Sequence, residues 1–297
     1  MERSLSVHRS RNGTIDFLKF IFALVVVIFH GRKLAAGNEF AFFQSGYLAV
    51  EFFFLVSGFL MMRSASRVTG DRPIGHETVS FLARKIKGLY PAILFAFVPA
   101  LATVTYIGSV PATAGSILSS VWEISLLRMS GIQGTTANTI TWYISAMLIA
   151  MLLLFPLILK FKDSFSYIIA PLAFIFIMGY LSQTGSLISP EKWMSVVYRG
   201  LLRALGELCL GCVCWQVSEQ LKKISFTAFA RVSLFVLQWG CILFSLGIMN
   251  VPASKLGYVC IILLAIGITI GFSGISALTP PPPWGVAGAD MLLARRV

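Results

Sequence analysis

Long apolar runs, separated by short polar stretches, make up most of the chain. Eight runs are long enough to be treated as membrane spans: residues 15–33, 46–63, 88–108, 142–159, 166–182, 197–216, 230–249 and 256–276. An α-helix needs about 20 mostly apolar residues to cross the hydrocarbon core of a bilayer. The pattern therefore predicts an all-α fold, a polytopic membrane helical bundle with about eight transmembrane helices.

The predicted membrane domain covers residues 15–277 and has a short polar tail on each side. The first tail, residues 1–14, is basic, and no small-residue cleavage site follows the first apolar run, so this run is predicted to be a signal anchor. The second tail, residues 278–297, contains four consecutive prolines, which end the last helix. This tail is interpreted either as a short cytoplasmic segment or as the product of a truncated or shifted reading frame.

The chain is 57% hydrophobic and 12% charged, yet its net charge is +12. With the N-terminus placed in the cytoplasm, sixteen Lys and Arg residues fall in inner segments and five fall in outer loops. Such an asymmetry is the positive-inside signature of membrane topology. It explains the basic charge without a nucleic-acid partner and predicts a multi-pass protein in a lipid bilayer with a cytoplasmic N-terminus.

The first span carries three polar side chains, Asp16 and Lys19 near its start and His30 at its end. Lys19 and His30 are eleven residues apart, close to three helical turns, so both point to one side of the helix, about 16 Å apart along its axis. Polar groups at membrane depth indicate a functional site. The alternative is a helix with snorkelling ends and a histidine in the headgroup zone.

The second span runs back inward from Gly46, which places Glu51 near its outer end. We therefore expect His30 and Glu51 at similar depth on sequential antiparallel helices. A carboxylate near an imidazole fixes its tautomer and raises its basicity, as a general base requires. The other two histidines, His8 and His76, lie in the basic tail and in the basic loop after the second span, and neither competes for this role.

The longest outer connection, residues 109–140, is rich in Gly, Ser and Thr and has an apolar middle around Trp122 to Leu127, so a re-entrant or interfacial segment is expected. Trp142 opens the fourth span. It is interpreted either as part of an aromatic belt or as a platform that lines a substrate groove.

The sixth span carries Arg199, Arg203 and Glu207 at helical spacing, so they form one polar stripe that descends from its outer end. This stripe is either a helix-packing device that neutralises itself or an anion or substrate contact that faces a cavity. All five cysteines lie in the second half of the chain, with no nearby histidine, and we interpret them as small apolar residues rather than metal ligands. No metal site is predicted.

Four sequence motifs resemble the membrane-bound acyltransferase 3 family of bacterial O-acyltransferases. The stretch IDFLKFIFALVVVIFH is similar to the first helix of that family, which has a basic residue, ten intervening residues and a histidine. The stretch GYLAVEFFFLVSGFL resembles its second motif, and FLARKIKGLYP and TWYISA resemble two weaker ones. The matching residues are Lys19 and His30, then Glu51, Phe52, Phe53, Ser57 and Gly58, then Phe81, Arg84, Lys87 and Pro91, then Trp142.

The resemblance covers most of residues 12–216. It implies transfer of an acyl group, usually acetyl, from cytoplasmic acetyl-CoA or a related acyl-CoA to a hydroxyl of an extracytoplasmic glycan, in the bacterial cytoplasmic membrane. His30 is then expected to act as general base or to carry the acyl group briefly, and Glu51 to orient it. A basic rim of Arg84, Lys85 and Lys87 near Lys19 is expected to attract the CoA phosphates. No permanently bound cofactor is expected.

The residues expected to bind donor or substrate are Asp16, Lys19, Ser57, Arg84, Lys87, Trp142, Arg203 and Glu207. The sequence departs from the family pattern at Lys19, where Arg is commoner, and at Glu51, where Asp is commoner. The family usually has about ten spans and a longer chain, so two C-terminal helices are expected to be missing here. Two alternatives stay open: a transporter or flippase for a lipid-linked sugar or small anion, and an inactive truncated relative.

Overall fold

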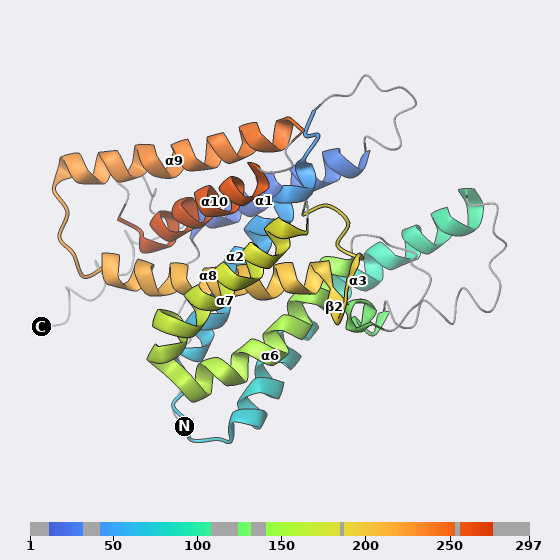
Figure 1. Cartoon of the computed structure of the whole chain (residues 1–297), viewed down its shortest axis with the longest axis horizontal. Helices are drawn as coiled ribbons and strands as arrows, with labels where there is room; N and C mark the ends of the chain where they lie inside the picture. The colour runs from blue at the N-terminus through green and yellow to red at the C-terminus, as the bar shows by residue number, and fades with distance from the viewer. Residues whose placement is uncertain are drawn as a thin grey trace, which may run out of the picture.

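The computed structural model of the chain is a bundle of long helices with almost no sheet (Figure 1). It describes residues 12–31, 42–107, 124–131, 141–184, 187–252 and 256–275. Most of the two predicted tails, and the predicted Trp122 start of the apolar segment in the 109–140 connection, lie outside these residues. The predicted all-α membrane bundle is confirmed.

Eight long helices are described, and each overlaps one predicted span. They are α1 (Gly13–Gly31), α2 (Ala49–Ala65), α3 (Ile74–Ile107), α6 (Trp142–Ser164), α7 (Ala170–Gln183), α8 (Arg199–Leu221), α9 (Ala228–Asn250) and α10 (Leu256–Ser273). Short elements join them: the 3₁₀ turns η1 (Gly46–Leu48) and η2 (Arg128–Ser130), the π-helix η4 (Phe165–Ile169), and the paired strands β1 (Trp193–Met194) and β2 (Val197–Tyr198).

Six helical segments of the described chain are long and apolar enough to cross a membrane. One of them, Trp142–Gln183, is 42 residues long and joins α6 to α7 through η4. At about 1.5 Å per residue it is about twice the thickness of a bilayer core. The backbone of Lys162, at φ 43° and ψ −114°, breaks the helical path just before η4, so α6 and α7 form two antiparallel arms that meet at one corner (Figure 1).

Helix α3 is longer than the sequence predicts, because it begins at Ile74 and not near residue 88. Pro73 directly precedes its first residue and Glu77 lies in its first turn, and both are typical of a helix N-terminus. The basic stretch that includes Arg84 is therefore helical. His76, which the sequence analysis places in a loop, lies in the first turn of α3.

The centre of the bundle is the contact between α2 and α8, which cross with their backbones unusually close. A Cβ added at Gly58 would collide with the carbonyl oxygen of Leu208, and one added at Gly211 would collide with that of Leu55. Small residues at such crossings let two membrane helices approach and increase their van der Waals contact. Only glycine therefore fits at these two positions.

Two apolar clusters pack on the two sides of the α2–α8 pair. One joins α2 to α1, α9 and α10, and its rings include the stacked pairs Phe22–Phe52, 4.4 Å between centroids, and Phe59–Phe272, 3.9 Å. The other joins α2 and α8 to α6 and the start of α3, where Phe81 stacks on Phe155. Helix α2 is thus covered on both faces.

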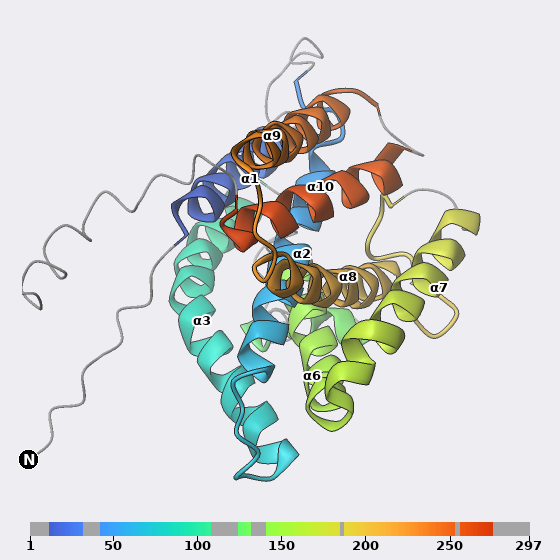
Figure 2. The same ribbon diagram turned by 90° about the vertical axis from the view of Figure 1, so that its left-hand side faces the viewer.

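Helices α1 and α10, the first and the last that are described, lie side by side (Figure 2). The side-chain amide of Asn12 donates a 2.9 Å hydrogen bond to the carbonyl of Gly271. Near the other end of α1, the backbone N–H of Ser45 donates to the carbonyl of Met249, at the end of α9. Helix α1 therefore packs on α10 as well as on α2, and the segment that joins α1 to α2 is fastened to the end of α9.

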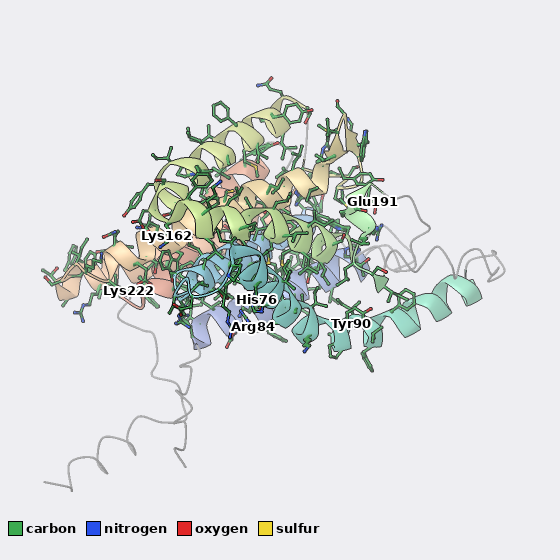
Figure 3. All side chains as sticks on the ribbon, turned by 90° about the horizontal axis from the view of Figure 1, so that it is seen from below. His76, Arg84, Tyr90, Lys162, Glu191 and Lys222 are labelled. Atoms are coloured by element: carbon green, nitrogen blue, oxygen red, sulfur yellow. The ribbon has the colours of Figure 1, made fainter. Side chains whose placement is uncertain are left out.

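The bundle has a basic end, which we define by the start of α1, α3 and α9 and the end of α2, α6 and α8. Lys162 and Lys222 lie toward this end and Glu191 lies toward the other (Figure 3). The described cations that the sequence analysis assigns to the inner side all belong to it: Arg63, Arg67, Arg72, Arg84, Lys85, Lys87, Lys160, Lys162, Lys222, Lys223 and Arg231. The predicted charge asymmetry is therefore a spatial feature of the bundle.

Candidate functional site

Helix α1 buries one narrow face and leaves its polar residues beside that face. Ile15, Leu18, Phe22 and Val25 are its buried residues, spaced as one stripe of a helix. Lys19 and Asp16 form a 3.0 Å ion pair at the basic end, and both side chains are about two-fifths exposed. An exposed pair of this kind is weak, so Asp16 contributes little to holding the Lys19 side chain in place.

His30 lies in the last turn of α1, half-buried, at the opposite end from Lys19. The edge of its ring meets the neighbouring Phe29 ring at 5.3 Å. Phe29 in turn packs against Tyr47 of η1, 5.9 Å between ring centroids, which fixes the end of α1 on the start of α2. The imidazole is thus held on an aromatic support without being enclosed.

The carboxylate of Glu51 forms an ion pair and a hydrogen bond with the guanidinium of Arg203 on α8. This partner was not predicted from the sequence. Both side chains are fully buried. The Nε of Arg203 also lies 4.0 Å from the carboxylate of Glu207, the next acidic residue along α8. Two carboxylates therefore share one guanidinium inside the bundle.

The depth of Glu51 also differs from the expectation that it lies level with His30. Phe22 faces Phe52 and Phe29 faces Tyr47, so Glu51 is level with the middle of α1, about 9 Å deeper than His30. Side chains on a helix lean toward its N-terminus, and α1 and α2 are antiparallel here. The two side chains consequently lean toward one another, and the role of Glu51 toward His30 stays a prediction.

Arg203 ties four parts of the fold together. Besides Glu51, it donates a 2.8 Å hydrogen bond to the carbonyl of Leu187, and its guanidinium lies 5.3 Å from the centre of the Trp142 ring at the start of α6. Arg199, one turn earlier, donates to the carbonyls of Ile188 and Thr184. The polar stripe of α8 therefore fastens the connection after α7 at the end opposite the basic end.

Arg128, buried like Arg199 and Arg203, supports the same end of the bundle. It forms an ion pair with Glu191 and a 3.4 Å hydrogen bond to the hydroxyl of Thr141. The backbone N–H of Met129 donates to the Ser145 hydroxyl on α6. The described part of the long connection, residues 124–131, is thus packed against the start of α6.

A cavity of about 480 Å³ opens at the basic end between α1, α2, α3 and α10, and we call it the basic cavity. Five cations and one carboxylate line it together with apolar and small polar side chains. The charged residues are Asp16, Lys19, Arg63, Arg67, Arg84 and Lys85. Of the three α3 cations expected near Lys19, Arg84 and Lys85 line the same cavity as Lys19, and Lys87 does not.

The other predicted donor or substrate residues are not in this cavity. Lys87 is exposed on α3, and Ser57 is half-buried in the middle of α2. Trp142, Arg203 and Glu207 lie in the interior near the opposite end. Their roles toward donor or substrate stay predictions.

Arg63 and Arg67 line the basic cavity, yet the sequence analysis treated them only as topology signals. A signal was present, because Leu60, Arg63 and Ser64 share one face of α2 and Arg67 follows at the same spacing in the turn directly after the helix. That face continues directly from the motif that contains Ser57. Extending the helix by one turn would have placed both guanidinium groups beside Lys19.

The cysteines are buried and unpaired by disulfides. Cys212 contacts the carbonyl of Gly58 on α2, whereas Cys214 contacts that of Ala265 on α10, each at 3.6 Å. The two thiols therefore face apart, as expected. Within the part of the chain that the structure describes, no group of three or more His, Cys, Asp or Glu residues is arranged to hold a metal ion.

A family model described as an acyltransferase domain, acyltransferase 3, matches residues 12–294. The chain belongs to the acyltransferase 3 family. The match continues well beyond residue 216, where the motif resemblance faded, and it includes α9 and α10. Neither the curated proteins nor the solved structures contain a match to this chain.

Membership of the acyltransferase 3 family, together with the apolar helical bundle, makes the protein a membrane acyltransferase. The match contains α1 with Lys19 and His30, α2 with Glu51, and every charged residue of the basic cavity. The structure therefore places the four family motifs on α1, α2, α3 and the start of α6 of this acyltransferase.

Proposed function

We propose that the protein transfers an acetyl group, or a closely related acyl group, from cytoplasmic acyl-CoA to a hydroxyl of a surface or exported polysaccharide or glycoside. In this proposal it is a multi-pass protein of the bacterial inner membrane, and its basic end faces the cytoplasm. The acyl-CoA is a substrate, and no permanently bound cofactor takes part. The acceptor glycan approaches from the other side of the bilayer.

The observation that carries the proposal is the basic cavity beside α1. Its five cations exceed its one carboxylate by four charges, which suits a ligand with several phosphate groups, such as the nucleotide part of CoA. Guanidinium groups bind phosphate with paired, charge-assisted hydrogen bonds. Arg63, Arg67 and Arg84 supply three of them, and Lys19 and Lys85 add point charges.

The reaction needs a base at the other end of α1, and His30 occupies that position. The hydroxyl oxygen of the acceptor attacks the thioester carbonyl as its proton passes to the imidazole. The carbon–sulfur bond then breaks, an ester carbon–oxygen bond remains, and the imidazolium returns the proton to the CoA thiolate. Histidine suits both steps because its unperturbed pKa lies near neutrality. The thioester must travel about 16 Å along α1 from Lys19 to reach it.

The remaining predicted residues take supporting roles in this proposal. Glu51 orients His30 or balances the charge of the imidazolium, and Arg203 holds the Glu51 side chain in place. Asp16 pairs with Lys19 until the donor arrives. Lys87, on the same helix as Arg84, guides the anionic donor toward the cavity. Ser57, Trp142 and Glu207 line the route or shape its walls.

The test measures ester-linked acetate on the surface glycans of a host strain that lacks the protein, and of the same strain with the chain restored. A second restoration carries His30→Ala, and a third carries His76→Ala, an exposed histidine of α3 outside the cavity. We expect acetate to return with the intact chain and with His76→Ala. It should stay absent with His30→Ala, because a general base contributes about 10²- to 10⁴-fold to the rate.

Equal membrane levels of the three chains, measured by immunoblot, make the comparison valid. Binding of labelled acetyl-CoA to the purified chain then separates the donor from the acceptor side of the proposal. Acetate that returns with His30→Ala removes this residue from catalysis. Absence of acetyl-CoA binding to the intact chain argues for the transport alternative.

A further inference from the structure

A second cavity of about 480 Å³ opens at the basic end, on the other face of α2. It lies between the end of α2, the start of α3, the end of α6 and the end of α8, and we call it the mixed cavity. Met62, Ala65 and Ser66 of α2 line it, whereas Arg63, Ser64 and Arg67 line the basic cavity. Nothing in the proposed transfer reaction uses it.

The mixed cavity combines an apolar floor with a rim of balanced charge. Its apolar lining includes Met62, Ile158, Leu159 and Trp215. The rim has three cations and three carboxylates, which are Arg72, Lys162, Lys223, Glu77, Asp163 and Glu219. Such a lining disfavours a polyanion, because the carboxylates oppose it, and favours an amphiphile whose head carries both signs of charge.

The backbone on one side of this cavity is held in an unusual conformation. Lys162 has φ 43° and ψ −114°, a region that costs a non-glycine residue about 1–3 kcal/mol and that clusters at functional sites. This break turns Lys162 and Asp163 onto the rim. Gln216 and Gln220, which line the cavity from α8, both donate to the Tyr167 hydroxyl in the π-helix that follows.

The surroundings of the cavity suit a molecule that is partly in the bilayer. Phe161, Tyr167 and Ile168, beside the break, are large, apolar and at least two-fifths exposed. In a membrane-spanning bundle such side chains face lipid. The cavity thus combines charged lining residues with aromatic and lipid-facing neighbours. This combination is typical of the depth at which phospholipid headgroups lie.

We propose that the mixed cavity binds the headgroup of a zwitterionic phospholipid with a primary ammonium, of the phosphatidylethanolamine type. Its phosphate contacts Arg72, Lys162 and Lys223, and its ammonium donates hydrogen bonds to Glu77 and Asp163. Glu219 contributes less, because it is also paired with Lys222 at 2.7 Å. The glycerol and upper acyl chains lie on Trp215 and Ile158. This site stands independently of the proposed acyl transfer.

Lipid retention by the purified full chain tests this proposal. Delipidated protein in detergent is mixed with equal amounts of dioleoyl phosphatidylethanolamine, phosphatidylcholine and phosphatidylglycerol, and bound lipids are counted by native mass spectrometry. We expect the ethanolamine lipid to exceed each of the other two about threefold, because exposed charged contacts are individually weak. Equal retention of all three lipids, or a preference for the glycerol lipid, would overturn the proposal.

Two variants locate the binding. Glu77→Gln/Asp163→Asn removes the ammonium partners and should abolish the preference for ethanolamine over choline. Lys223→Gln weakens the phosphate contact and should lower retention of both lipids alike. Asp71→Asn, an exposed carboxylate outside both cavities, is the matched control and should retain the preference. A preference that persists in the double variant with an unchanged melting temperature would also overturn the proposal.

Discussion

The basic cavity and the mixed cavity have the same volume, lie at the same end of the bundle and share α2 as a wall. Their charges nevertheless differ, with five cations against one carboxylate in the first and three against three in the second. The difference arises because residues one or two positions apart on a helix point to different faces. Arg63 and Arg67 turn toward α1, while Met62 and Ala65 turn toward α6.

This comparison shows that a basic membrane face is not one uniform surface. The positive-inside rule considers all cations on one side of the membrane together. The ligand that a group of these cations can bind depends, however, on how many carboxylates lie near them. The carboxylates of Glu77, Asp163 and Glu219 balance the three cations of the mixed cavity, so the lining of this cavity has no net charge. We therefore expect the donor to distinguish the two cavities by charge alone.

Removing the ion pair that holds α2 to α8 should have the largest effect, because it acts on the wall that both cavities share. Arg203→Met leaves Glu51 buried without its cation, so we expect a loss of about 3–5 kcal/mol in the free energy of unfolding. Thermal and urea unfolding in detergent measure it. Glu51→Gln combined with Arg203→Met should regain part of the loss, and Arg231→Met, an exposed cation, should change little.

Substituting a crossing glycine tests the same wall sterically. Gly211→Ala places a methyl group against the carbonyl of Leu55 and 2.9 Å from the Cα of Gly58, so we expect about 1–3 kcal/mol of destabilisation. Gly240→Ala is the control, because no atom lies within 4 Å of its added Cβ. Ligand binding at both cavities should weaken together in Gly211→Ala. A change at one cavity alone would show that α2 does not act as a rigid wall.

Reversing one charge should separate the cavities. Arg84→Glu in the basic cavity should raise the acyl-CoA dissociation constant about 10- to 100-fold, the value of a lost charge-assisted contact. Arg72→Glu in the mixed cavity should change it by about twofold or less. Titration calorimetry with acetyl-CoA measures both. Equal effects would mean that long-range potential, and not the cavity lining, attracts the donor.

Neutralising the single carboxylate of the basic cavity should slightly increase the charge difference between the two cavities. Asp16→Asn releases Lys19 from its 3.0 Å ion pair, and the exposed pair is worth little, so we expect donor affinity to rise about two- to threefold. The same calorimetric titration detects the change. Weaker donor binding would instead show that Asp16 positions Lys19 for the phosphate.

The helical bundle followed from the sequence because spans are recognised by their length and apolar composition, which are local properties. The start of α3 did not, since Arg84 and its neighbours were interpreted as a loop although they continue a helix from Ile74. Charge identifies the side of a membrane, but it does not end a helix. The break at Lys162 is likewise a backbone feature without a glycine to mark it.

The candidate site was predictable to the extent that its residues are close in sequence. Lys19 and His30 share one helix, and two of the three α3 cations expected near Lys19, Arg84 and Lys85, line its cavity. The partner of Glu51 was not predictable, because Arg203 is 152 residues away and is brought to it by the α2–α8 crossing. Glu51 was therefore expected level with His30, although the ring contacts between α1 and α2 place it deeper and the α2–α8 crossing pairs it with Arg203.

The hydrogen bond from Asn12 to the carbonyl of Gly271 joins residues 259 positions apart, and Asn12 and Phe272 both line the basic cavity. During synthesis α1 enters the bilayer long before α10 exists. The proposed donor site is therefore incomplete on a nascent chain and forms only when α10 is inserted beside α1. In this proposal, insertion of α10 therefore sets the moment at which the chain can first bind acyl-CoA.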